Sequence, residues 1–300
     1  MPMLLVKGSF QITGTEPDGD TVGFVPTRHP DWNRVPGAAR LDLTNSCRGK
    51  LRLDAVDALE THYGPTSAPA HQPLPFAHAA RDELLAWLGF TEVRRAPDSE
   101  RVVSAVPESV PGWILTGGVD VHGRCVALAG RGPLPEDTRS GQEVTVGVPL
   151  LRRTVNHHLI ARGLAYPTFY GNLFADLREE LAAVTRQARS AGTGLWPVDA
   201  STAGAKVTGL SSLTDEAVVV PKLFRRLFDH LASGELSPSP SPSPASSFRA
   251  FLAGAADEYR ILSSATPRAL VRGLHHVVEV TDDGMVRMTV PIEDLVFSEA

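Results

Sequence analysis

Five short segments in the first 130 residues alternate apolar and polar side chains, and this period of two constrains the fold more than any other feature. A β-strand places successive side chains on opposite faces, so such segments are typical of strands with one buried face. The predicted strands cover residues 4–12, 21–25, 51–57, 113–119 and 124–129. Apolar residues at helical spacing predict three helices, at residues 76–88, 148–162 and 173–190. Helices after the third and fifth strands favour a small barrel with attached helices over a doubly wound sheet.

The composition changes near residue 200, where a run of small and polar residues predicts a domain boundary. We expect a first domain over residues 1–200, with insertions at residues 26–48, 91–112 and 131–147. After it we expect a helical connector (201–236), a Ser-Pro linker (237–247) and a small C-terminal region (248–300). The last 100 residues form a predicted α/β extension without a chemical motif. They could serve substrate choice, docking of a protein partner or self-association.

The bulk composition is that of an ordinary soluble protein with a slightly acidic balance. The net charge of −5 argues against tight, sequence-independent binding of nucleic acid over a broad surface, but not against a focused phosphate site. Two cysteines do not make a disulfide framework, so free thiols are expected. The sequence contains no apolar run of membrane-spanning length and no secretory signal. We therefore predict a cytoplasmic protein that has no membrane partner.

Three clusters of charged residues combine the side chains that phosphodiester hydrolysis requires. They are Asp18-Gly19-Asp20-Thr21, the set Arg52, Asp57 and Glu60, and the set Asp120, Gly123 and Arg124. Carboxylate oxygens suit a hard divalent cation, and guanidinium groups bind phosphate oxygens in a fork. A further carboxylate can orient or deprotonate water. Each cluster alone is more typical of a β-turn or a surface ion pair, so the chemistry rests on their order and spacing.

In that order and spacing, the chain resembles the staphylococcal nuclease family over about residues 3–199. The matching segments are Pro17–Val22, Leu51–Thr61, Asp120–Arg124, Arg162–Tyr166 and Gly194–Pro197. The resemblance implies an α+β, β-rich fold, in which a five-stranded OB-type barrel carries three helices. It also implies Ca²⁺-dependent cleavage of DNA or RNA that leaves a 3′-phosphate and a 5′-hydroxyl.

The resemblance also implies a role for each matching position. Asp20, Asp57 and the backbone carbonyl of Ala58 would be calcium ligands, and Glu60 would position or activate the attacking water. Arg52 and Arg124 would bind the phosphate and stabilise the transition state. Six further residues would support the calcium ligands or contact the substrate: Asp18, Thr21, Asp120, His122, Phe169 and Tyr170.

The chain departs from the family pattern where the substrate would bind. The family's Asp-Thr-Pro-Glu is Asp57-Ala58-Leu59-Glu60 here, so a rigid proline is lost. Val121 and His122 replace the tyrosyl and basic residues expected before the second arginine. These departures leave an alternative open, in which the chain is a catalytically weak or inactive OB-fold module that binds nucleic acid or protein.

Overall fold

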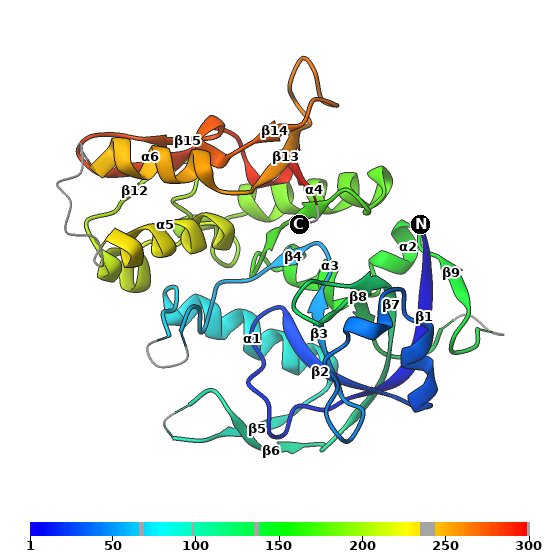
Figure 1. Ribbon diagram of the computed structural model, residues 1–300. Helices are drawn as coiled ribbons and strands as arrows, with labels where there is room; N and C mark the ends of the chain where they lie inside the picture. The colour runs from blue at the N-terminus through cyan, green and yellow to red at the C-terminus, as the bar shows by residue number, and fades with distance from the viewer. Residues whose placement is uncertain (66–68, 98, 135–137, 235–243, 299–300) are drawn as a thin grey trace.

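A closed five-stranded β-barrel forms one half of the molecule in the computed structural model, which describes residues 1–65, 69–97, 99–134, 138–234 and 244–298 (Figure 1). The barrel strands are β1 (Pro2–Phe10), β2 (Thr21–Pro26), β3 (Gly49–Leu53), β7 (Val110–Val119) and β8 (Cys125–Gly130). They pair in the order β2-β3-β8-β7-β1, and the pairing of β1 with β2 closes the ring. A short strand, β9 (Glu143–Thr145), adds to β1. The predicted α+β class and a closed barrel are confirmed, and the barrel is consistent with the OB type.

Three helical regions pack on the barrel close to where they were predicted. Helix α1 (Leu74–Leu88) ends at Gly89, whose φ of 114° favours glycine. Helix α4 covers Ala175–Ser190. The single helix predicted at residues 148–162 is instead two helices, α2 (Val148–Leu151) and α3 (Val155–Ala161). The chain restarts at Thr154, whose hydroxyl accepts a hydrogen bond from the His157 N–H and caps α3.

All three predicted insertions contain regular structure, and β9 lies in the third, residues 131–147. Residues 91–112 contain a hairpin of β5 (Glu92–Arg95) and β6 (Val102–Val106), and β7 already begins at Val110. Residues 26–48 contain the 3₁₀ helices η1 (His29–Arg34) and η2 (Ala38–Arg40). The sequence predicted an insertion over residues 91–112 but did not assign the two strands of this hairpin.

The C-terminal third forms a second layer beside the barrel (Figure 1). It contains helices α5 (Pro221–Gly234) and α6 (Pro244–Gly254) and the π-helical segment η4 (Ser212–Glu216), with two short sheets. One sheet joins β12 (Ala205–Lys206), β16 (Met285–Met288) and β15 (Val278–Val280). The other runs β11 (Phe169–Tyr170), β17 (Leu295–Phe297), β13 (Glu258–Ile261) and β14 (Val271–Arg272). Residues 237–243 of the predicted Ser-Pro linker lie outside the described residues.

Two hydrophobic cores hold these layers, and the second core takes side chains from both sides of residue 200. The first fills the barrel and reaches α1, α3 and α4. The second joins Leu59, Ala77 and Tyr166 to Phe224 and Leu227 of α5. Strand β11 also pairs in parallel with β17, so a strand from the first 200 residues joins a sheet of the C-terminal layer. Helix α5 is therefore fixed against the segment that follows β3.

The described part of the chain holds no helix with the length and apolar character needed to cross a membrane. Both cysteines, Cys47 and Cys125, are free thiols, as predicted. Cys125 is fully buried in the barrel.

Asn156 ties α3 to strand β8 and to the turn between β3 and β4 (Val56–Asp57) through three buried hydrogen bonds. Its side-chain amide donates to the carbonyls of Asp54 (2.8 Å) and Ala127 (3.1 Å), and its oxygen accepts from the Ala129 N–H (2.9 Å). In Asn156→Leu at least two buried backbone groups would lose their partners. Each such group costs about 1–3 kcal/mol, so the free energy of unfolding should fall by at least about 2 kcal/mol.

Urea unfolding followed by circular dichroism measures this loss. Val121→Ala, which trims an exposed side chain, is the control and should change stability by less than about 0.5 kcal/mol. Equal stability of Asn156→Leu and the wild type would contradict this role of Asn156.

Candidate functional site

Arg52 lies at the centre of the candidate site because the chain folds around its guanidinium group. Arg52 is near the end of β3, and the chain then turns through Ala55, whose φ is 61°, into β4. Its Nη1 donates to the Val56 carbonyl (2.5 Å) inside this turn and lies 2.8 Å from Asp20 Oδ2. Its Nη2 donates to Asp57 Oδ1 at 2.8 Å. The arginine therefore links two acidic residues that are 37 positions apart in the sequence.

Asp20 is held by the tight turn that precedes β2. Its Oδ2 accepts a hydrogen bond from the Ala58 N–H (3.0 Å), and its Oδ1 accepts one from the Thr21 hydroxyl (3.1 Å). The Asp20 N–H donates to Asp18 Oδ1. A Cβ atom at Gly19 would lie 2.4 Å from the Ala58 Cβ, so only glycine lets the turn approach β4 this closely. The Asp-Gly-Asp-Thr motif thus fixes one carboxylate beside the acidic end of β4.

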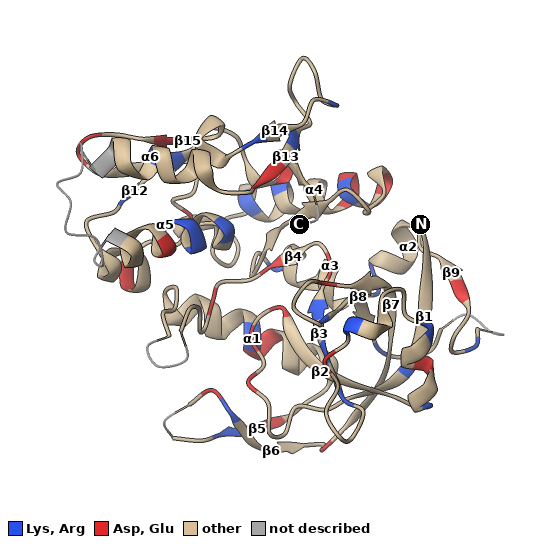
Figure 2. Cartoon of the chain, in the orientation of Figure 1, with Lys and Arg blue, Asp and Glu red and all other residues tan. Residues whose placement is uncertain are grey.

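Glu60 and Asp57 are bridged by an arginine that the sequence reasoning did not single out. Arg225, on α5, places Nη2 3.0 Å from Asp57 Oδ2 and Nη1 2.5 Å from Glu60 Oε1. Asp57 is fully buried, and its carboxylate lies between the guanidinium groups of Arg52 and Arg225. Figure 2 shows a basic stretch on the part of α5 nearest to β4. The C-terminal layer therefore supplies one of the site's charged groups.

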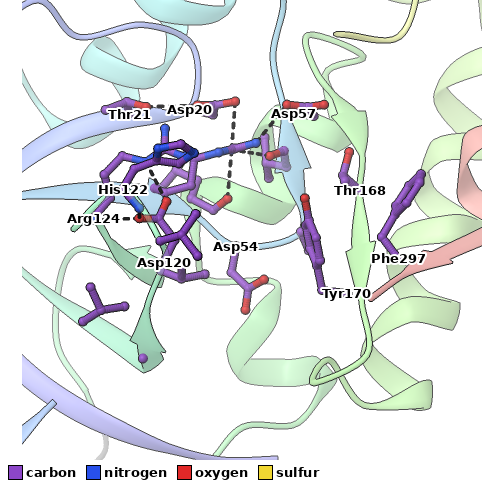
Figure 3. Close-up of a pocket in the computed structure, with 18 of the residues that line it drawn as sticks. Asp20, Thr21, Asp54, Asp57, Asp120, His122, Arg124, Thr168, Tyr170 and Phe297 are labelled. Carbon is purple, nitrogen blue, oxygen red and sulfur yellow. Dashed lines mark hydrogen bonds and ion pairs between the residues drawn. The ribbon is translucent and has the colours of Figure 1, made fainter. Parts of the chain in front are cut away.

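Arg124 and Asp120 form a separate part of the site at the β7–β8 connection. Arg124 Nε lies 2.7 Å from Asp120 Oδ2, and Asp120 Oδ1 accepts the N–H groups of His122 and Arg124 at 2.9 Å. Figure 3 shows these side chains on the same side of the pocket as Asp20 and across from Tyr170. In the described chain Arg124 pairs with Asp120, whereas Arg52 pairs with Asp20 and Asp57.

One cleft of about 1130 Å³ connects these groups. It is lined by Asp18, Asp20, Thr21, Arg52, Asp57, Glu60, Asp120, His122, Arg124 and Tyr170, together with Arg225, Lys222 and Phe297 of the C-terminal layer. Ten of the twelve predicted site residues therefore face one hollow. The exceptions are Ala58, whose N–H binds Asp20, and Phe169, which is fully buried in the core and does not line the cleft. Adjacent strand residues point to opposite faces, so Tyr170 faces the cleft while Phe169 does not.

Burial and mutual repulsion give the three carboxylates different acidities. Burial raises the pKa of Asp20 to about 7, against the attraction of Arg52 and with help from Asp18 and Asp57. Burial also raises the pKa of Glu60, although Arg225 opposes the shift. For Asp57, burial acts in the same direction, but Arg225 and Arg52 outweigh it and lower the pKa. Near neutral pH, Asp57 is thus the most firmly ionised carboxylate of the cluster.

The carboxylates have the right chemistry for calcium, but their arrangement does not fit an ion as they lie. Calcium needs six to eight oxygen ligands at 2.3–2.6 Å. Here guanidinium groups contact one oxygen of Asp20, both oxygens of Asp57 and one oxygen of Glu60. Among the described residues, no three His, Cys, Asp or Glu side chains converge in a way that could hold a metal.

Comparison with known proteins gives no relative from which to transfer a function. No protein-family model matches the chain, and no curated protein matches it significantly. The resemblance to the staphylococcal nuclease family therefore rests on the motifs in the sequence.

Arg225 could not be recognised from local sequence, although α5 carries a weak signal. Lys222, Arg225 and Arg226 share the polar side of a strongly amphipathic helix, and such residues are usually solvated. In the structure Lys222 and Arg226 both pair with Asp257, whereas Arg225 pairs with Asp57 and Glu60. Contacts between positions so distant in the chain leave no short motif.

The raised pKa of Asp20 predicts a specific pH dependence of stability. Because the folded pKa of about 7 exceeds the ordinary value of 3.8, the folded state holds a proton that the unfolded state releases. The free energy of unfolding should therefore fall as pH rises from about 4 to about 7, and Asp20→Asn should lack this decline. Guanidinium unfolding of both proteins across this range tests it. Parallel pH profiles would show that the pKa of Asp20 is not raised.

Proposed function

We propose that this protein is a phosphodiesterase that hydrolyses DNA or RNA at the cleft between the barrel and the C-terminal layer. The observation that carries the proposal is the gathering of Asp20, Arg52, Asp57 and Glu60 on the wall of one cleft that Arg124 also lines. Carboxylates beside guanidinium groups in a partly enclosed site can bind a phosphodiester and stabilise the charge that develops on it. The resemblance over residues 3–199 supports the same reaction.

Within this proposal each residue has a defined task. The guanidinium groups of Arg52 and Arg124 would bind phosphate oxygens from two sides of the cleft. The carboxylate of Glu60 would accept a proton from the attacking water, and its raised pKa brings it closer to the range where a general base works well. Tyr170, whose side chain lines the cleft, offers an aromatic face for a base or sugar. Dependence on calcium stays part of the proposal, because carboxylates are the ligands that this ion prefers.

One observation favours the alternative of an inactive binding module. Each carboxylate of the cluster is already paired with an arginine of the same chain, as in an ion network that serves structure. The two functions differ in one measurable way, since a module would retain nucleic acid without cleaving it.

Incubation of the full chain with plasmid DNA and with single-stranded RNA, in calcium or in EDTA, tests the proposal. We expect cleavage in calcium and loss of cleavage in EDTA. Arg52→Ala and Arg124→Ala should each reduce the rate by about 10²–10³, the usual effect of removing one transition-state donor. Glu60→Gln should reduce it as well, because an amide cannot accept the proton.

Arg152→Ala is the matched control for the arginine variants. It removes a guanidinium group from an exposed ion pair with Glu180, and Arg152 does not line the cleft. The control should keep wild-type activity. Binding of nucleic acid without cleavage, both in calcium and in EDTA, would favour the binding module and overturn the hydrolase.

A further inference from the structure

Two basic side chains that line the cleft, Lys50 and Arg40, differ from the others in having no acidic partner. The remaining lysine and arginine side chains of the lining all form ion pairs: Arg52, Arg124, Lys222, Arg225 and Arg226. Within the described part of the chain, no carboxylate lies within ion-pair distance of Lys50 or Arg40. Their charges are therefore available to an anion that enters the cleft.

Lys50 lies beside both arginines to which the proposed function assigns the phosphate. On β3, Lys50 is exposed and Arg52 is half-buried, whereas Leu51 between them is fully buried, so the two basic side chains share the outer face. Figure 2 shows basic residues on this strand. Two positions along a strand span about 6.6 Å, which is comparable to the distance between neighbouring phosphates of a nucleic-acid strand. The register that sets Leu51 opposite Cys125 also sets Lys50 beside Arg124.

Arg40 reaches the same place from the first insertion, which packs on the turn between β7 and β8. The Asp42 N–H donates to the Gly123 carbonyl at 2.9 Å, and a Cβ atom at Gly123 would lie 2.9 Å from the Arg40 carbonyl. The Arg40 side chain donates from Nη2 to the Val119 carbonyl (2.7 Å) at the end of β7. The guanidinium group of Arg40 is thus fixed next to the turn that carries Arg124.

The formal charges at this end of the cleft leave room for one anion. Arg40, Lys50 and Arg124 supply three positive charges, and Asp42 and Asp120, which also line the cleft, supply two negative charges. One positive charge is left over, and one phosphodiester group would neutralise it. Lysine and arginine are the side chains that most often contact phosphate oxygens of nucleic acids.

We propose that Lys50 and Arg40 form a second phosphate site, which binds the phosphate next to the one held by Arg52 and Arg124 on the same nucleic-acid strand. The inference rests on the proposed function, because it extends the path of the substrate along the same cleft. It also defines the substrate class. A strand that fills both sites has at least two successive phosphates, so an oligonucleotide fits this cleft better than an ester of a single nucleotide.

The salt dependence of binding counts the phosphates that the protein neutralises. We would measure the fluorescence anisotropy of a labelled single-stranded decathymidylate with the full chain in EDTA, over a series of potassium chloride concentrations. Each neutralised phosphate contributes about −0.7 to the slope of log K against log salt for a single strand. The double variant Lys50→Ala with Arg40→Ala should therefore have a slope shallower by about 1.4. If both proteins bind equally at 1 M salt, the variant should bind about 25-fold more weakly at about 0.1 M.

A second double variant, Lys206→Ala with Arg152→Ala, is the matched control. It removes the same net charge from two exposed positions that do not line the cleft, and it should keep the slope and affinity of the wild type. Arg40→Gln keeps a donor for the Val119 carbonyl without the charge. It replaces Arg40→Ala in the test if circular dichroism shows that Arg40→Ala does not fold.

An unchanged slope and affinity in the folded variant of Lys50 and Arg40 would overturn the second phosphate site. Absence of DNA binding by the wild type would also overturn it, and so would an equal loss in the control, since net charge alone would then explain the effect. The cleavage assay is read separately. A shallower slope in the variant, with no cleavage by the wild type, would leave this inference standing and overturn the hydrolase alone.

Discussion

The buried carboxylate of Asp57 is the constraint on which the arrangement of this molecule depends. An ionised carboxylate out of water is strongly unfavourable unless charged groups compensate it, and removal of one partner from such a pair is costly. Asp57 meets this requirement with Arg52 from the barrel and Arg225 from α5. Because the two arginines come from different layers, the same ion pairs that neutralise Asp57 also hold the C-terminal layer to the barrel.

Packing brings Arg225 to the correct place and explains why the cleft has walls from both layers. Tyr166 and Leu59 of the first 200 residues share a core with Phe224 and Leu227 of α5, and β11 pairs with β17. These contacts present the polar side of α5 to the end of β4. The cleft that results combines acidic groups of the barrel with basic and aromatic groups from residues beyond 200. Any ligand in this cleft would therefore contact residues of both layers.

The sequence predicted the parts of this structure that local patterns encode. Alternation located the barrel strands, and the Asp-Gly-Asp-Thr turn with the Arg52–Glu60 segment anticipated side chains that the fold brings to one cleft. Where several long-range contacts decide the outcome, the sequence was less informative. The hairpin at residues 92–106 was predicted only as part of an insertion, and Phe169 was grouped with Tyr170 although it points into the core. Arg225 lies 168 positions after Asp57 and had no motif to mark it.

A crystal structure of the full chain with calcium and a nucleoside 3′,5′-bisphosphate tests most directly whether the cluster around Asp57 is one site for cation and phosphate. We expect an ion bound by Asp20 and Asp57, and phosphate oxygens bound by Arg52 and Arg124. Calcium and nucleotide bound elsewhere, or not bound at all, would contradict this expectation.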